Sequence, residues 1–121
     1  MNLKKILSFV AAATLCFSLV GCAAGNGGKG GDDLIKVGII NNDPNESGYR
    51  TANDRDMKET FTKENGFDAS FAYSLKNDEQ IGFAQKFIQD EVDYLLLSAA
   101  DTAGWDSVLK DAQAAGVKVI L

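Results

Sequence analysis

The chain has 121 residues, which leaves room for one small domain behind a short N-terminal segment. Its 12 basic and 17 acidic residues give a formal net charge of -5, and this acidic balance disfavours binding to nucleic acid or to anionic lipid headgroups. The absence of histidine excludes Ser-His-Asp and Cys-His catalysis and any His-ligated metal site. We therefore predict a protein that is not an enzyme, holds no cofactor or metal, and does not bind nucleic acid.

Residues 1–21 have the parts of a secretory leader. Lys4 and Lys5 give a positive start, and residues 6–20 form a mostly apolar stretch that is short for a transmembrane helix. The motif Leu-Val-Gly-Cys at residues 19–22 resembles the lipobox of bacterial lipoproteins, in which the chain is cut before the cysteine and the thiol is acylated. This pattern predicts a signal peptide over 1–21 and a lipid anchor on Cys22, at the extracytoplasmic face of the cell membrane. The alternative is an ordinary cleaved signal followed by an unmodified cysteine.

The segment that follows is dominated by glycine and has no apolar side chain larger than alanine. We predict that residues 22–33 are the lipidated cysteine and a flexible tether. The pair Gly28-Lys29 lacks the following Ser or Thr and the preceding strand of a phosphate-binding loop, so we reject that reading. The folded domain is expected over residues 34–121.

Four segments of this domain are predicted to be strands. Residues 35–40, 92–97 and 117–121 are nearly continuous apolar runs, which suit parallel strands buried on both faces. Residues 67–73 instead alternate between apolar and polar side chains, which is typical of an edge strand with one wetter face.

Three helical patterns separate these strands, each with apolar residues three or four positions apart. The expected buried side chains are Tyr49, Ala52, Met57 and Phe61 in the first helix, Ile81, Ala84, Phe87 and Ile88 in the second, and Trp105, Val108, Leu109, Ala112 and Ala115 in the third. Asn77 and Gln80 are spaced as a capping pair for the second helix. Gly66 and Gly116 are the expected stops of the first and third helices.

The resulting order β-α-β-α-β-α-β predicts an α/β fold, an open doubly wound parallel sheet with strand order 2-1-3-4. In such sheets, ligands bind beyond the carboxyl ends of the strands. Residues 41–50 and 98–105 are the two polar loops expected at that edge. The last predicted strand is also the end of the chain, which suggests a truncated product or a fragment.

The residue types of the first loop suit a sugar. Arg50 and Glu46 can each make two hydrogen bonds to neighbouring hydroxyls, and the C–H face of a sugar ring can lie on Tyr49. A solvated turn with a helix N-cap explains the same composition about equally well. Trp105 lies on the apolar face of its helix and is more often a core residue than a ligand contact.

Several segments resemble a known family. These are the Glu-Ser-Gly-Tyr-Arg loop at 46–50, the strand at 92–97, the Thr-Ala-Gly-Trp helix start in 102–110, and residues 115–120. They resemble the sugar-binding proteins of ABC transporters, in the type I periplasmic binding protein superfamily, and look most like its galactofuranose-binding branch. The resemblance covers residues 35–121.

The resemblance implies a solute-binding protein that captures a monosaccharide, such as galactofuranose or a related aldose, between two α/β lobes and delivers it to an ABC transporter permease. Carried over by position, the ligand-binding residues would be Asn41, Glu46, Ser47, Tyr49 and Arg50, with Gly48 beside Ser47 at the start of a helix that faces the ligand. Family members continue past residue 121 into a second lobe, so this chain is expected to be the N-terminal part of the first lobe, with weak or no sugar binding by itself.

Other functions fit the residues less well. A lipid-anchored receiver-like or sugar-sensing regulatory domain without a transport role would share the sheet, with Asp43 and Asp101 as its acidic residues, but the fifth strand of a receiver is missing. A transcription regulator would need a helix-turn-helix where this chain has a leader.

Overall fold

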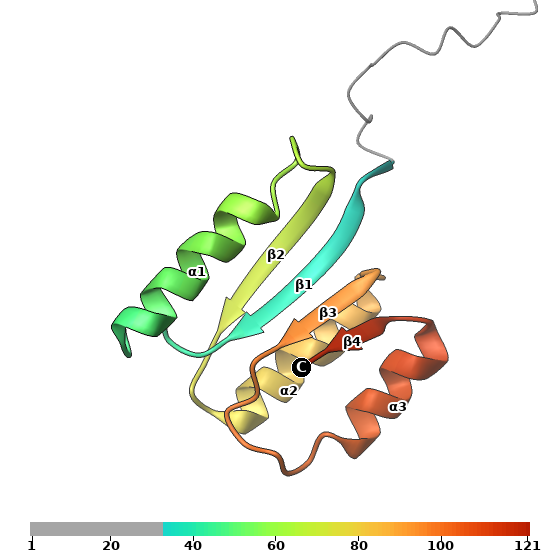
Figure 1. Cartoon of the computed structure of the whole chain (residues 1–121). Helices are drawn as coiled ribbons and strands as arrows, with labels where there is room; N and C mark the ends of the chain where they lie inside the picture. The colour runs from blue at the N-terminus through green and yellow to red at the C-terminus, as the bar shows by residue number, and fades with distance from the viewer. Residues whose placement is uncertain (1–32) are drawn as a thin grey trace, which may run out of the picture.

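The computed structural model describes residues 33–121, so the predicted leader, Cys22 and nearly all of the predicted tether lie outside the described residues. Its strands are β1 (Ile35–Asn41), β2 (Phe67–Tyr73), β3 (Tyr94–Leu97) and β4 (Lys118–Ile120), and its helices are α1 (Gly48–Thr60), α2 (Asn77–Gln89) and α3 (Asp106–Ala115). Strands and helices alternate along the chain as predicted (Figure 1). No helix in this part of the chain is long and apolar enough to cross a bilayer.

The four strands form one parallel sheet in the order β2-β1-β3-β4, which confirms the predicted fold and strand order. The segment with alternating polarity, β2, lies at one edge of the sheet as predicted, and its side chains are half-buried or exposed. Because all strands run the same way, their carboxyl ends lie at one edge, which we call the carboxyl edge.

One face of the sheet is covered by α2 and α3, which pack against each other and against the strands. The buried cluster on this face contains Ile40, Ala84, Phe87, Val92, Leu95, Leu97, Trp105, Val108, Ala112 and Val117. The predicted buried sides of α2 and α3 are therefore confirmed, with one exception. Ala115 is exposed, because the helix ends there and the chain turns away at Gly116. Gly116 stops α3 as predicted, with a left-handed φ of 75° and its N–H bonded to two carbonyls of the last turn.

Helix α1 lies beside β1 and β2, apart from α2 and α3 (Figure 1). The predicted buried side of this helix is wrong at Tyr49, which is 72% exposed, and no side chain of α1 is fully buried. The other three predicted residues, Ala52, Met57 and Phe61, are half-buried. The helix also ends at Thr60, and Gly66 belongs to the turn before β2 rather than to the helix stop. The apolar pattern of α1 is too weak to bury a full face.

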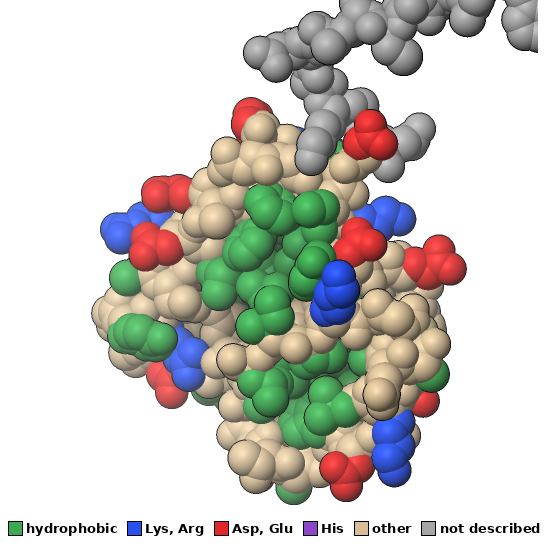
Figure 2. Space-filling model, turned by 45° about the vertical axis from the view of Figure 1, so that its right-hand side comes forward, with side chains coloured by type: hydrophobic (Ala, Val, Ile, Leu, Met, Phe, Trp, Pro, Cys, Tyr) green, Lys and Arg blue, Asp and Glu red, His purple; other side chains and the backbone are tan. Residues whose placement is uncertain are grey.

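Hydrophobic side chains also gather on the surface of the domain, with charged side chains around them (Figure 2). Phe71, Ile39, Leu96 and Ile120 stand opposite one another across the four strands and share the face on which α2 does not pack. Ile120 is 51% exposed and Leu121 is 86% exposed, so this face is covered incompletely by residues 33–121.

Candidate functional site

A groove of about 510 Å³ opens at the carboxyl edge and runs along this second sheet face beside α1. Its polar end is lined by Asn41, Tyr49, Arg50, Asn53, Ser98 and Thr102. Its apolar end is lined by side chains of the sheet and by Met57 of α1. Both loops that the sequence predicted for a ligand site therefore contribute to one groove.

Arg50 is the centre of the polar end. Its Nη1 donates to the Ser98 hydroxyl at 2.9 Å and to the Asn41 side-chain oxygen at 3.2 Å. The side chain is 24% exposed, and its Nε lies 3.7 Å from a carboxylate oxygen of Glu46. Since both hydrogen bonds leave from Nη1 and Nε lies beside Glu46, Nη2 is the nitrogen left to donate to a ligand in the groove.

The orientation of Arg50 begins with the helix cap. The Ser47 hydroxyl accepts a hydrogen bond from the Arg50 backbone N–H at 3.2 Å and is the N-cap of α1. Arg50 therefore lies in the first turn of the helix, where its side chain reaches across the end of β1 to the end of β3. The Ser47 hydroxyl is engaged in this cap. For this residue the structure therefore shows the helix N-cap that was the alternative to a ligand contact.

Asn41 is the last residue of β1 and is 4% exposed. Its side-chain oxygen accepts from the Asn42 backbone N–H at 2.9 Å as well as from Arg50, and its amide donates to Asn53 at 2.7 Å. The amide of Asn41 thus links the start of α1 to the central strand. It fixes the guanidinium and leaves little of its own hydrogen-bonding capacity for a ligand.

The other two predicted residues lie at the rim of this cluster. The guanidinium carbon of Arg50 is 5.7 Å from the Tyr49 ring centroid, so the ring and the cation are neighbours. Tyr49 is strongly exposed, and the Glu46 side chain is 48% exposed, so both are free to meet a ligand from solvent. The structure brings Asn41, Glu46, Tyr49 and Arg50 together.

Sequence reasoning placed Ser98 in a predicted ligand loop without naming it as a site residue, and it missed Asn53. Ser98 follows the apolar run of β3 directly, and in a parallel sheet such a residue lies at the same edge as the residue that ends β1. Asn53 is three positions after Arg50 on α1, a spacing that places both side chains on one side of a helix. Both signals are present in the sequence, but neither residue type is distinctive enough to separate from an ordinary polar surface.

Known proteins resemble the chain over most of its length, although no protein-family model matches it. The chain is 38% identical over 121 residues to the fructose import binding protein FruE of Bifidobacterium longum (strain NCC 2705), covering 98% of this chain and 36% of that protein. It therefore spans about a third of the length of this relative.

Two solved structures agree with it in sequence and in fold. One, from Mycobacterium smegmatis in complex with β-D-fucofuranose, is 35% identical with a TM-score of 0.67, over 73% of this chain and 29% of that one. The other is the periplasmic binding protein component of the arabinose ABC transporter from Shewanella sp. ANA-3, bound to α- and β-L-arabinofuranose, at 33% identity and a TM-score of 0.63 over 69% of this chain and 28% of that one.

The chain is related to the sugar-binding proteins of ABC transporters. Its sheet and helices match part of one lobe of a type I periplasmic binding protein, so the predicted fold and the predicted resemblance to these proteins are confirmed. These relatives are transport binding proteins rather than enzymes. They give no support to a receiver-like or sugar-sensing regulatory domain.

In this relative of sugar-binding proteins, polar contacts join α1 to the edge strand. The Tyr73 hydroxyl of β2 hydrogen-bonds one oxygen of the Asp54 carboxylate, and Lys58 donates to the other at 2.8 Å. Burial alone would raise the pKa of Asp54, but the hydrogen bonds from Lys58 and Tyr73 outweigh it and lower the pKa. Burial, with the neighbouring carboxylate, raises the pKa of Tyr73, and the bond to Asp54 raises that of Lys58. The cluster is therefore a charged clamp at neutral pH.

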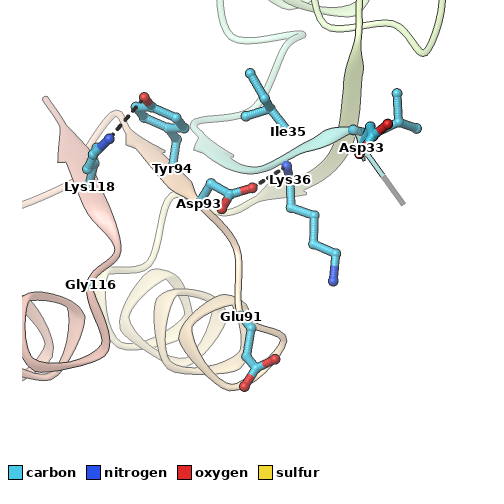
Figure 3. A pocket seen from close by; sticks show the side chains of 9 residues that line it. Asp33, Ile35, Lys36, Glu91, Asp93, Tyr94, Gly116 and Lys118 are labelled. Atoms are coloured by element: carbon cyan, nitrogen blue, oxygen red, sulfur yellow. Dashed lines mark hydrogen bonds between the residues drawn. The ribbon is translucent and has the colours of Figure 1, made fainter. Parts of the chain in front are cut away.

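A second hollow, of about 540 Å³, lies at the opposite edge of the sheet, where the strands begin (Figure 3). Its polar groups hydrogen-bond one another near the first residues of the strands. Asp93 accepts a hydrogen bond from the Lys36 backbone N–H at 2.8 Å, and the Lys118 ammonium donates to the Tyr94 hydroxyl at 3.3 Å. None of the predicted ligand-binding residues lies there. Over residues 33–121 there is also no cluster of acidic or cysteine side chains suited to a metal ion.

Proposed function

We propose that this chain supplies one sugar-binding face of a solute-binding protein that delivers a monosaccharide to an ABC transporter permease. The observation that carries this proposal is the half-buried Arg50, held by Asn41 and Ser98 where β1 and β3 end. Ligands of open α/β sheets bind at this edge. A guanidinium fixed in this way presents paired donors to neighbouring hydroxyls, which a sugar ring supplies.

The proposed ligand is a monosaccharide in its furanose form, galactofuranose or a related sugar. Two structural relatives hold furanose sugars, and one sequence relative is named for fructose import. In this groove, Arg50 would donate to ring hydroxyls, Glu46 would accept from them, and the C–H face of the ring would lie on the exposed Tyr49.

This face is half of the proposed site. The relatives are about three times as long as the matched part of this chain. We propose that a second lobe closes over the groove by a hinge motion and that the closed form docks on the permease. By itself, the face formed by residues 33–121 would hold a sugar weakly, because one open surface leaves most of the sugar in water.

The proposed setting is the extracytoplasmic face of the cell membrane. Residues 1–21 would direct export and be removed, and acyl chains on Cys22 would hold the protein at the membrane. The glycine-rich residues 22–33 would then be the tether between anchor and domain.

Calorimetric titration of the full-length two-lobed protein with D-fructose, L-arabinose and methyl β-D-galactofuranoside tests this proposal. We expect one of these sugars to bind, and Arg50→Gln to weaken binding at least tenfold, because hydrogen bonds to a charged donor contribute about 1.5–3 kcal/mol. The matched control is Arg55→Gln, on the same helix, whose side chain is 65% exposed and pairs with Asp56. Equal affinities for the Arg50→Gln variant and the wild type would contradict the proposed site.

A further inference from the structure

Gln80 is a polar side chain in the first turns of α2 that is fully buried. Its amide nitrogen lies 3.1 Å from the Asn42 side-chain oxygen, 2.9 Å from the Ser74 carbonyl and 3.2 Å from the Ser98 carbonyl. Its amide oxygen accepts from the Ala100 backbone N–H at 2.8 Å. Burial of a polar group is costly unless it is hydrogen-bonded, so this environment accepts glutamine and few other side chains.

The partners of Gln80 come from three separate connections. Asn42, Ser74 and Ser98 are the residues that directly follow β1, β2 and β3. These connections form the carboxyl edge, on which the groove opens. One side chain therefore joins all three connections at a single point behind the groove, on the side of the sheet that α2 covers.

Asn77 precedes Gln80 by three positions and holds the far end of the β3–α3 connection. Its amide donates to the Ala103 carbonyl at 2.7 Å, and its oxygen accepts from the Trp105 indole at 3.0 Å. The indole also donates to the Asp101 carbonyl at 2.9 Å. The two residues were predicted to cap α2, and that prediction is wrong: the N-cap is Lys76, which makes no side-chain cap. The capping-like spacing instead serves a contact between α2 and the connection.

We propose that Gln80 and Asn77 are the positioning residues of the sugar-binding groove. Together they fix the connection of residues 98–105 at both ends, and Ser98 in turn accepts the hydrogen bond that holds Arg50. The guanidinium is thus aimed by residues of a helix on the opposite face of the sheet. The expected effect on sugar affinity rests on the proposed function. The expected effect of Gln80 and Asn77 on the conformation of residues 98–105 does not.

Amide hydrogen exchange of the full-length protein without sugar tests the positioning role. In Gln80→Met, which keeps side-chain length but loses the donors and the acceptor, we expect the Ala100 amide and its neighbours in 98–104 to exchange at least tenfold faster. Amides of β1 and β3 should keep their wild-type rates. The matched control is Gln85→Met, at an exposed position of the same helix. Unchanged exchange in 98–104, or an equal rise in the loop and the strands, would overturn the proposal.

Asn77→Ala provides a second variant on a partly exposed position, useful if Gln80→Met does not fold. Trp105 is the single tryptophan of this chain, and in a protein whose remaining part has its tryptophans replaced by phenylalanine it reports on the connection alone. We expect a red-shifted emission and stronger acrylamide quenching in Asn77→Ala. Wild-type emission and quenching would overturn the role of Asn77.

Sugar titration of the same variant then tests whether the conformation of residues 98–104 affects sugar affinity. We expect Gln80→Met to weaken sugar affinity about tenfold although Arg50 is intact, because Ser98, one of the two partners that hold the guanidinium, is no longer fixed. If residues 98–104 loosen and affinity stays at the wild-type value, the positioning proposal for binding is overturned. If the wild type itself binds none of the sugars, the proposed function fails, and the exchange experiment alone decides whether Gln80 fixes the connection.

Discussion

At Gly38 the sheet and helix α2 are so close that a larger side chain would not fit. It lies on the central strand β1, and a Cβ atom built there would stand 2.6 Å from Cδ2 and 3.1 Å from Cβ of Phe87. Phe87 is buried on α2 and belongs to the main core. Because the Phe87 Cβ is attached to the helix backbone, rotation of the ring alone cannot relieve the overlap, and α2 must move away from β1.

We therefore predict that Gly38→Ala lowers the free energy of unfolding by about 1–3 kcal/mol, the usual cost of overpacking. The matched control is Gly82→Ala on α2, where a Cβ would meet no atom within 4 Å. That change should stabilise the protein by about 0.5–1 kcal/mol, because alanine favours the helix over glycine. Urea unfolding of both variants measures the difference. A Gly38→Ala variant as stable as the wild type would show that β1 and α2 lie farther apart than described.

At the scale of elements, α1 depends on polar contacts to a greater extent than α2 and α3. It carries Tyr49 and Arg50 of the proposed sugar site, yet it buries no side chain fully, and the charged clamp of Asp54, Lys58 and Tyr73 links it to β2. The Lys58 ammonium also lies 5.5 Å from the Tyr73 ring centroid. Conditions that discharge the clamp should therefore loosen the helix that carries Arg50.

This dependence predicts a pH effect with a definite sign. The pKa of Asp54 is lowered from 3.8 in the folded chain, so its contribution to stability is full above that value and is lost as the pH falls through the lower, folded value. Asp54→Asn should cost about 1 kcal/mol of unfolding free energy at pH 7, and the difference from the wild type should shrink below pH ~4. Urea midpoints at pH 7 and pH 3 test this. A difference that stays constant over that range would contradict the clamp.

The elements also show how far a sequence can be interpreted. The buried faces of α2 and α3 and the edge position of β2 were predictable from apolar periodicity. The sheet against which these helices pack is formed by residues 33–121, so the pattern of buried and exposed side chains is visible in this sequence. The packing of α1 was not, since its polar side chains have partners, such as Tyr73, that periodicity does not indicate. Arg50 could be singled out because it was expected in a polar loop after a strand and belongs to the Glu-Ser-Gly-Tyr-Arg segment that resembles the family, although the structure places it in the first turn of α1. Gln80 was misassigned because one spacing serves both a cap and a distant contact.

At the scale of the whole molecule, the groove and the second sheet face belong together. The polar end of the groove holds Arg50, and its apolar floor continues into Ile120 and Leu121, which remain exposed over residues 33–121. Covering such a surface with more protein is favourable, because burial of apolar area contributes roughly 25 cal/mol per Å² to the free energy of the contact. The proposed second lobe and the rest of the first would supply that cover.

The central claim is that a sugar binds at the carboxyl edge against Arg50 and Tyr49. A crystal structure of the full-length protein with whichever of D-fructose, L-arabinose and methyl β-D-galactofuranoside binds it tests this claim most directly. We predict the sugar at the polar end of the groove, with a ring hydroxyl within hydrogen-bonding distance of the Arg50 guanidinium and the ring against Tyr49. A sugar held at the hollow where the strands begin, or anywhere without contact to Arg50, would contradict the account.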